Sequence, residues 1–564
     1  MSYIQVCLPL RLPWEPWYST TDDGIRVGMR VAVHFARKTY TAVVISVGGT
    51  PDVDKVLPID YVETSLPDIS EKELQLWRFV SSYYMCTLGE VYKLAYPGGK
   101  RNSERVTASE RERAALKEEK LHQNLESKLT RLQTRLESKQ EALGKKHTEA
   151  VAERLRNEAE SLQEQIKAVR ESLEALNASK DAPARQSSIS FGEKPALLLG
   201  TERIESYIKA IRGCLDDGRQ ALVLASENDY ADRLHAALKK EFGERVRCFT
   251  SETAAGERRR TLNATRDEDA CVVIGTRSAV FLPYSALGLV IVDEEQDPSF
   301  KQREHPPLYN GRDTAAMLAK IHGARLILGS ACPSLESLHN CLNGKYELLC
   351  RKAQAVPAYK TTLIDINEEK KKRGMVGAFS RKAIEQIRRL PTDTTISIIR
   401  CYLDENEAEI QARELLGDRP FRILTPAAAR KTELHSDLSL ILNADALFDR
   451  DDFRADEKAL HVMYAIASRC HSLVVQCNSS ALPVYGVLRA LSSLDGETFA
   501  RTLLPLVEER RGFKLPPYSK IVDIRSGGTL ISREVLTKDS SLPSQKKWLR
   551  ERWGDKYIFD VDPI

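Results

Sequence analysis

Three consecutive carboxylates follow an apolar run in the middle of the chain. Residues 289–302 read LVIVDEEQDPSFKQ, so Asp293, Glu294 and Glu295 come directly after a strand-sized segment. Such a segment is typical of a buried strand, which delivers the side chains after it to one edge of a sheet. Adjacent carboxylates at that edge suit phosphoryl chemistry, because one holds Mg²⁺ and the next orients the attacking water. This arrangement is typical of nucleic-acid-dependent ATPases.

The phosphate-binding half of such a site is largely missing. It requires a glycine-rich loop whose backbone N–H groups, with a lysine and a hydroxyl, hold the phosphates and the metal. Here ALLL at 196–199 is followed by Gly200 and Thr201, and then by a helical pattern. Lys209 would lie about two helical turns further on, too far to replace the missing lysine. We interpret Gly200 and Thr201 as vestigial and expect no ATP or magnesium cofactor.

The elements that must position these residues alternate between strand and helix. From residue 196 onward, short apolar runs are separated by helical patterns near 202–215, 229–242 and 311–322. Unalternated apolar strands joined by helices predict a doubly wound parallel sheet. A second series of strand-like runs has the same character and occupies 361–366, 395–400, 421–426, 438–447 and 473–478. The fold class is therefore α/β, with two parallel-sheet lobes.

The first 180 residues have two different compositions. Residues 1–100 contain short β-type runs separated by Gly, Asp and Pro, which predicts a small β-rich domain with a helix laid on it. Residues 101–180 are rich in Glu, Lys, Arg, Ala and Leu, with leucines at 4-3-4 spacing, which predicts a coiled coil. We favour a helical hairpin that bends near Gly144 over a single rod. Residues 181–195 form a Ser- and Pro-containing linker.

An aromatic and basic cluster stands in the N-terminal domain. Trp17 and Tyr18, preceded by Trp14, are followed by Arg37, Lys38 and Tyr40. Aromatic faces stack on unpaired bases and cations meet phosphates, so the cluster suits a single-stranded DNA end. The alternative is that the aromatic rings pack against the core or the coiled coil.

Composition limits the classes of function. A chain of 564 residues with 42% hydrophobic residues is long enough for about three to five soluble domains. The net charge is only +4, so contacts with nucleic acid must come from local patches. The cysteines are scattered singly and the histidines lack ligand spacing, so we expect no zinc or other metal site. We find no signal sequence or membrane span and expect a cytoplasmic protein.

Two further basic runs can be interpreted in two ways. Arg258, Arg259 and Arg260 stand in the first lobe, and Lys370 to Arg373 stand in the second. Either run is compatible with contact to a DNA backbone. A basic run is more often a solvated face, and we favour that interpretation for both.

Five segments spread over the chain resemble the PriA family of replication-restart DNA helicases. They are VVIGTRSAVFLPYSALGLVIVDEEQDPSFKQ (272–302), RLILGSACPSLES (325–337), YYMCTLGEVYKLAYPGG (83–99), NADALFDRDDFRADEKAL (443–460) and EERRGFKLPPYSKI (508–521). The resemblance implies a DNA 3′-end-binding domain at 1–100, RecA-like helicase lobes at 196–355 and 356–485, and a shortened C-terminal region at 486–564. It also implies that Thr276 and Arg277 contact DNA or couple the lobes. The alternative is that these strand-end residues cap the next turn.

The chain also departs from that family's pattern. The G-x-T-G-S-G-K-T phosphate loop is absent, and YAIASRCHS (464–472) keeps only Arg469 of the two arginines that stabilise the transferring phosphate. The family's zinc-binding cysteine pairs are absent as well. We therefore interpret Asp293, Glu294 and Arg469 as vestigial and expect no helicase activity.

Three hypotheses follow for the function. The first is a helicase-inactive PriA-like protein that binds forked or 3′-ended DNA in replication restart or primosome assembly. Its coiled coil would bind a primosome or replisome partner or a second copy of itself. The second is an active ATP-dependent 3′→5′ DNA helicase, with ATP and Mg²⁺ as cofactors. The third is a coiled-coil scaffold that does not bind DNA.

Overall fold

The computed structural model describes most of the chain outside residues 98–193. The described ranges are 2–53, 55–97, 194–200, 203–267, 269–350, 359–431, 435–448, 452–491 and 496–563, with short pieces at 130–131, 133–134, 136–138 and 162–163. The short pieces are helical. The predicted coiled coil at 101–180, its bend near Gly144 and the linker at 181–195 lie almost wholly outside the described residues.

The N-terminal residues form a six-stranded sheet with the order β5-β2-β1-β4-β3-β6. Its strands are β1 (Ser2–Cys7), β2 (Trp17–Thr20), β3 (Arg30–Phe35), β4 (Lys38–Val47), β5 (Leu57–Pro58) and β6 (Tyr61–Val62). Two helices follow, α1 (Glu71–Tyr84) and α2 (Leu88–Ala95). Both begin at a capping box, in which a hydroxyl and a glutamate satisfy each other's backbone N–H groups. The predicted β-rich domain with a helical segment is confirmed.

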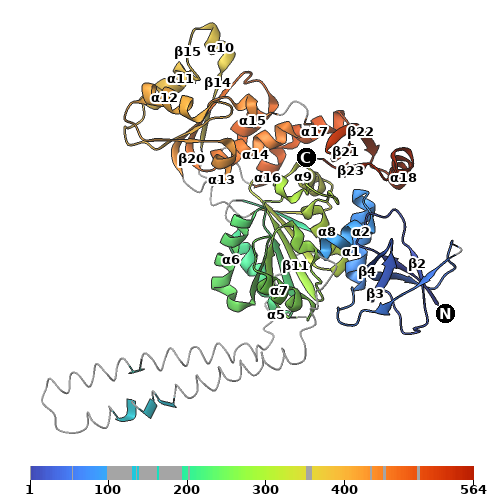
Figure 1. The fold of residues 1–564 in the computed structure, drawn as a ribbon. Coiled ribbons are helices and arrows are strands. Elements are labelled where there is room, and N and C mark those ends of the chain that lie inside the picture. Colours follow the sequence, from blue (N-terminus) through green and yellow to red (C-terminus); the bar gives the residue numbers. More distant parts are fainter. Residues whose placement is uncertain are drawn as a thin grey trace. The chain divides into compact units, whose positions relative to one another are not determined.

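The next part of the chain, which we call lobe 1, is built on a seven-stranded parallel sheet (Figure 1). The strand order is β13-β7-β12-β11-β8-β10-β9. The strands are β7 (Ala196–Leu199), β8 (Gln220–Leu224), β9 (Val246–Phe249), β10 (Val272–Gly275), β11 (Leu287–Asp293), β12 (Arg325–Ser330) and β13 (Glu347–Cys350). Parallel pairing needs a crossover after each strand, and the crossovers here carry helices or turns.

Helices cover both faces of this sheet. They are α5 (Ile204–Asp216), α6 (Asn228–Phe242), α7 (Ala255–Arg266), α8 (Gly311–His322) and α9 (Leu335–Leu342), with the short 3-10 turns η1 (Gly243–Arg245), η2 (Arg277–Phe281) and η3 (Pro298–Phe300). Alternate residues of a strand enter opposite cores: Leu198 packs with α5 and α6, and Leu197 packs with α8 and α9. The helices predicted near 202–215, 229–242 and 311–322 are confirmed as α5, α6 and α8.

The following part, lobe 2, has a five-stranded parallel sheet with the order β14-β20-β19-β17-β18. The strands are β14 (Lys360–Asp365), β17 (Ile396–Ile399), β18 (Phe421–Leu424), β19 (Ser436–Ile441) and β20 (Cys470–Cys477), and a small hairpin pairs β15 (Met375–Val376) with β16 (Phe379–Ser380). The helices are α10 (Ile366–Lys371), α11 (Arg381–Arg388), α12 (Glu405–Leu416), α13 (Pro426–Lys431) and α14 (Ala455–Ala467), with the turn η4 (Ala444–Leu447). The predicted second parallel sheet is confirmed.

The C-terminal region adds helices and a three-stranded antiparallel sheet, ordered β22-β21-β23. Its elements are α15 (Pro483–Ala490), α16 (Gly496–Thr502), α17 (Leu504–Gly512), β21 (Ser519–Ser526), β22 (Thr529–Thr537), α18 (Leu542–Trp553) and β23 (Ile558–Val561). The buried amine of Lys301 in lobe 1 pairs with Asp560 at 2.9 Å and donates to the Val561 carbonyl at 2.6 Å. The end of the chain is therefore fixed to lobe 1.

The described residues include no candidate for a membrane span or a metal site. None of their helices combines the length and the apolar character that crossing a lipid bilayer requires. Their Cys, His, Asp and Glu side chains form no group of three or more that could hold a metal ion.

Candidate nucleotide site and DNA-end surface

Four neighbouring strands of lobe 1 end side by side. Because β7, β12, β11 and β8 are adjacent and parallel, their carboxyl ends lie on one edge of the sheet. In open α/β sheets this edge is where ligands bind. The structure brings Gly200, Asp293 and Glu294 together there, and the N–H of Gly200 donates to the carbonyl of Ser330 at 3.1 Å. The edge is therefore assembled as the sequence predicts.

A cation from the chain itself occupies the carboxylate pair. Arg203, the N-cap residue of α5, donates from Nε to Oδ1 of Asp293 at 2.7 Å, and its terminal nitrogen pairs with Oε1 of Glu294. The same guanidinium donates to the carbonyl of Gly200. The Arg203 side chain is 5% exposed and that of Asp293 is 2% exposed, so this pair is withdrawn from water. The guanidinium bridges both carboxylates, as a bound cation would.

Two tyrosines complete the contacts to Asp293. Tyr207, one helical turn after Arg203, donates its hydroxyl to Oδ1 at 2.6 Å, and Tyr230 of α6 donates to Oδ2. The approach of Tyr207 requires Gly329, because a Cβ at that position would lie 1.7 Å from the Tyr207 hydroxyl oxygen and 2.8 Å from Oδ1 of Asp293. Both oxygens of Asp293 are thus engaged by donors from the protein.

The electrostatics maintain these protonation states. Burial works against the charge of Arg203, but Asp293 and Glu294 raise the pKa of its guanidinium well above the usual value. Burial, followed by the charge of Asp293, raises the pKa of both Tyr207 and Tyr230, so their hydroxyls stay protonated and keep donating. Burial also opposes the charge of Glu294, yet Arg203 lowers its pKa and keeps it ionised.

These residues do not fit a magnesium ion. Mg²⁺ requires near-octahedral oxygen ligands at about 2.0–2.1 Å, so an ion on Oδ1 of Asp293 would lie within about 5 Å of the Arg203 Nε. At that separation, charges of +2 and +1 repel by roughly 7 kcal/mol at an effective dielectric constant of about 20. Both oxygens of Asp293 already accept hydrogen bonds from the protein, which compete with a metal ion. Arg203 must leave before a metal can bind.

The phosphate cradle is incomplete as well. The N–H of Gly200 is directed to Ser330 and is not available to a ligand. Lys209 is an exposed residue of α5, beyond Tyr207 along the helix. Thr201 lies outside the described residues. Among the residues that the structure describes after β7, no lysine reaches the carboxylates.

A cavity of about 800 Å³ adjoins this site. Arg203, Tyr230 and Glu294 line it from lobe 1, and Arg469 lines it from the end of α14. The structure therefore places Arg469 on the same cavity as Glu294, where its NH1 donates to the carbonyl of Ala465 at 2.9 Å. Nine carboxylates and eight lysine or arginine side chains line the cavity, so it lacks the cationic excess expected around a triphosphate.

Glu295, the third carboxylate, has a structural role. Its side chain is fully buried and accepts hydrogen bonds from the N–H and hydroxyl of Ser334, at 2.6 and 2.9 Å, and from the hydroxyl of Ser337 at 2.9 Å. Arg312 neutralises it at 3.0 Å. These contacts fix the start of α9 to the end of β11.

In the N-terminal domain, Arg37 and Lys38 lie at the tip of the β3–β4 hairpin. Phe35 pairs with Lys38, so Ala36 and Arg37 form a two-residue turn, and both have positive φ, 46° and 65°. These angles are typical of a type I′ turn, where Asn-Gly is usually preferred, and side chains carry a strain cost there. The turn makes both cations exposed.

The aromatic residues of this cluster separate into different environments. Trp14 is 52% exposed and its ring centroid lies 6.1 Å from that of Phe35, next to the hairpin tip. Tyr18 is buried and donates to the carbonyl of His34 at 2.8 Å, which favours packing over base stacking. Trp17 lies against Gly49, just beyond the other end of β4, and Tyr40 packs partly into the core of the sheet.

Thr276 and Arg277 lie at the end of β10. Thr276 is the N-cap residue of η2 without a side-chain cap bond, and Arg277 donates to the carbonyl of Ser299 at 2.9 Å. Arg277 also packs against Gly311, where an added Cβ would lie 2.8 Å from the Arg277 Cβ and 3.2 Å from its Cα. These contacts lie within lobe 1, and contact with DNA stays a prediction for both residues.

Sequence reasoning missed Arg203, Tyr207 and Tyr230. One signal was available: an arginine and a tyrosine four residues apart begin the helix that follows Gly200, where a lysine was sought. Residues four apart share one helix face, so both side chains point the same way. Tyr230 carried no comparable signal.

Two parallel-sheet lobes, with carboxylates at a sheet edge and Arg469 on the same cavity, are typical of the RecA-like fold. Comparison with protein families narrows this class. Residues 5–97 match the model of the PriA 3′ DNA-binding domain. Over these residues the chain is similar to the PriA family.

PriA proteins from several bacteria are also similar to this chain. Replication restart protein PriA from Chlamydia pneumoniae is 36% identical over 192 residues, which are 34% of this chain and 26% of the relative. The PriA protein of Rickettsia prowazekii is 28% identical over 376 residues, 66% of this chain and 49% of the relative, and that of Haemophilus influenzae is 27% identical over 406 residues, 66% and 55%. The chain thus spans between a quarter and about half the length of these relatives.

Solved structures with a partly similar chain include RecG bound to a three-way DNA junction, with a TM-score of 0.34 and 16% identity over 56% of this chain and 44% of the other. Another is Saccharomyces cerevisiae Dbp5 bound to RNA and ADP BeF3, with a TM-score of 0.34 and 10% identity over 57% and 89%. Scores this low support no inference, so the fold class rests on the strand order.

Proposed function

We propose that this protein binds forked or 3′-ended DNA through residues 5–97 and acts in replication restart or primosome assembly without unwinding DNA by ATP hydrolysis. The observation that carries the proposal is the bridge of Arg203 between Asp293 and Glu294. It occupies the place at which a motor of this class needs a metal ion. No ATP or magnesium cofactor is part of the proposed function.

DNA binding is supported by the family match and by the exposed hairpin. The matched residues 5–97 include Trp14, Arg37 and Lys38, which stand exposed around the β3–β4 turn. An aromatic face beside two cations provides both stacking and phosphate contact for an unpaired strand end. The protein would then serve as a binding platform, with protein partners of the primosome or replisome recruited through other surfaces, including the segment 101–180.

The test of DNA binding is fluorescence anisotropy with a labelled fork that has a free 3′ end. We expect binding that weakens steeply with salt and that loses roughly five- to a hundredfold in affinity in Trp14→Ala, the range of one base–aromatic stack. Tyr18→Phe removes only a hydroxyl bonded inside the core and is the matched control. Affinity that is the same for the fork and for blunt duplex, or unaffected by Trp14→Ala, would contradict this interface.

A further inference from the structure

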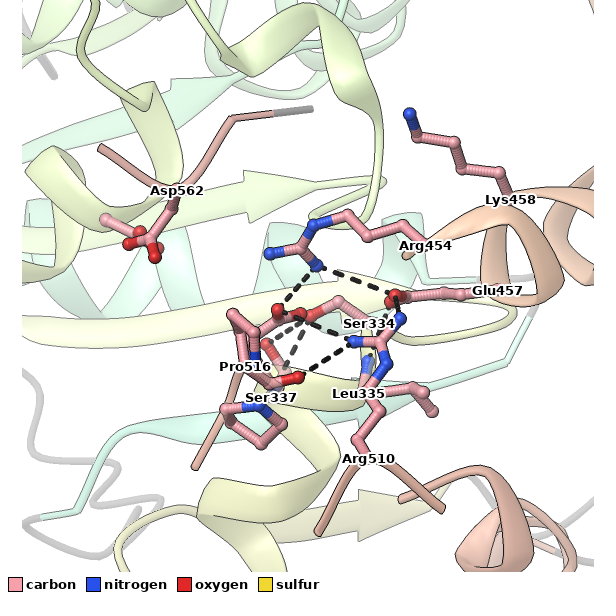
Figure 2. A network of polar contacts seen from close by, with 12 residues as sticks. Ser334, Leu335, Ser337, Arg454, Glu457, Lys458, Arg510, Pro516 and Asp562 are labelled. Carbon is pink, nitrogen blue, oxygen red and sulfur yellow. Dashed lines mark hydrogen bonds and ion pairs between the residues drawn. The ribbon is translucent and has the colours of Figure 1, made fainter. Parts of the chain in front are cut away.

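A second polar network lies around the first turn of α9, and several of its residues line the same cavity (Figure 2). Three parts of the chain meet there: α9 of lobe 1, α14 of lobe 2 and α17 of the C-terminal region. The network centres on two carboxylates, Glu336 of α9 and Glu457 of α14, and two arginines, Arg454 and Arg510. We call these four side chains the latch.

Glu457 is the link from lobe 2 to lobe 1. It is 4% exposed, and its Oε1 accepts the N–H of Leu335, the first residue of α9, at 2.9 Å. Its Oε2 accepts Arg510 of α17 at 2.6 Å. One carboxylate therefore joins the start of a lobe 1 helix to a helix of the C-terminal region, and it does so at the N-terminus of α9, where the helix dipole favours a negative charge.

Each of the two arginines contacts both glutamates of the latch. Arg454 pairs with Glu336 at 2.5 Å and with Glu457 at 3.5 Å, and Arg510 pairs with Glu336 at 3.7 Å. Arg510 is 5% exposed and also donates to the carbonyl of Pro516. His461 of α14 adds a contact to the Pro333 carbonyl in lobe 1 at 3.2 Å. Each charge has a partner from another part of the chain.

The surroundings make the latch costly to open. Apolar residues from lobe 1, lobe 2 and the C-terminal region pack in one continuous core around it, including Leu335, Met463 and Leu506, all at most 3% exposed. Glu295 also holds the start of α9, because its carboxylate accepts hydrogen bonds from the N–H and the hydroxyl of Ser334. Separating the lobes would leave buried charges without partners, which is strongly unfavourable. A cleft that opens and closes in a working cycle needs a weakly held interface instead.

We propose that the latch fixes lobe 2 and the C-terminal region to α9, so that the two lobes form one rigid body. The consequence is a cavity of constant width between the lobes, with no opening and closing. This inference does not depend on DNA binding by residues 5–97, and it concerns a different set of residues from the Arg203 site.

The test measures the distance between the lobes with a pair of spin labels. Lys240 of α6 and Glu414 of α12 are exposed helix positions, and labels attached there through non-natural amino acids avoid the chain's eleven cysteines. We expect one narrow distance distribution by double electron–electron resonance, unchanged by Mg·ATP or by forked DNA. A broad or two-peaked distribution in the unsubstituted protein would overturn the proposal.

Variants identify the latch as the cause. Glu457→Ala and Arg510→Met should each broaden the distribution, and amide hydrogen exchange at Leu335 should accelerate at least tenfold in Glu457→Ala. Glu369→Ala is the matched control, because Glu369 is a buried carboxylate of lobe 2 that pairs with Lys382 at 2.8 Å and does not reach lobe 1. If Glu457→Ala does not fold, Arg510→Met decides the question. An unchanged distribution in the variants would also overturn the proposal.

Discussion

At the scale of single residues, Arg203 determines what the carboxylate site can do. It neutralises Asp293 and Glu294 from within the chain, and the two tyrosines donate one hydrogen bond to each oxygen of Asp293. An aspartate in this position that holds a metal ion would need those oxygens open. In the proposed function, the guanidinium stands where a metal ion would bind, and the edge has a structural role.

Arg203→Ala should lower the free energy of unfolding by about 3–5 kcal/mol, because it leaves Asp293 buried with an unpaired charge. Guanidinium unfolding followed by circular dichroism measures the shift. Arg212→Ala, an exposed arginine of the same helix paired with Glu241, should cost less than about 1 kcal/mol. Adding Asp293→Asn to Arg203→Ala should recover part of the loss. Equal losses in the two arginine variants would show that the bridge is unimportant.

Gly329→Ala tests the packing that brings Tyr207 to Asp293. The new methyl group would overlap the Tyr207 hydroxyl, so the variant must displace the ring and should lose about 1–3 kcal/mol of stability. Gly213→Ala lies in α5 with open space around its Cβ and should be neutral or more stable by about 0.5–1 kcal/mol. Thermal unfolding of both variants makes the comparison, and a Gly329→Ala protein as stable as Gly213→Ala would contradict the geometry.

At the scale of elements, the β3–β4 hairpin is the part of the N-terminal domain suited to a charged ligand. Arg37→Ala combined with Lys38→Ala should reduce the slope of log affinity against log salt by about 1–1.5, because each phosphate contact to a single strand contributes about 0.7. Lys240→Ala, at an exposed lysine of α6 outside the basic runs, serves as the control. Salt titrations of fork binding give the slopes, and identical slopes would place the DNA elsewhere.

The contact between α1 and α8 predicts a pH dependence. Burial, with Lys72 and Arg219 nearby, lowers the pKa of His322 from 6.5 to about 4, and Lys72 lies 3.5 Å from its Nδ1. Between about pH 6.5 and pH 4, His322 is protonated in the unfolded chain and neutral in the folded one. The free energy of unfolding therefore falls as the pH drops through that window.

His322→Gln removes the titrating group and should retain about 1 kcal/mol more stability at pH 5, relative to its own value at pH 7.5, than the unsubstituted protein. Urea unfolding at the two pH values gives both differences. If the variant loses as much stability between pH 7.5 and pH 5 as the unsubstituted protein, His322 is not the group responsible.

At the scale of the whole molecule, the sequence predicted the elements better than their side-chain partners. Short apolar runs identify the strands of both parallel sheets, because buried strands consist mostly of apolar residues. The helix predicted near 311–322 is α8. The position of Asp293 at the edge next to Gly200 follows from the parallel order. The contact of Arg203 with the carboxylates does not follow from the strand order, because the direction of the Arg203 side chain depends on where α5 begins. Glu457 and Arg510 are 53 residues apart, and no periodicity connects them.

Residues of two networks thus line the cavity. One fills the carboxylate edge of lobe 1, and the other, the latch, connects α9 to lobe 2 and the C-terminal region. Both networks fit the proposed function, in which the two lobes serve as a binding body and Arg203 gives the carboxylates a structural role.

DNA-stimulated ATP hydrolysis tests this account most directly. The measurement compares the unsubstituted protein with Asp293→Ala, both purified identically, in the presence of Mg²⁺ and a fork that the protein binds. We predict phosphate release at the same background rate for both proteins, with fork binding intact in the unsubstituted one. DNA-dependent turnover that Asp293→Ala abolishes would contradict the account.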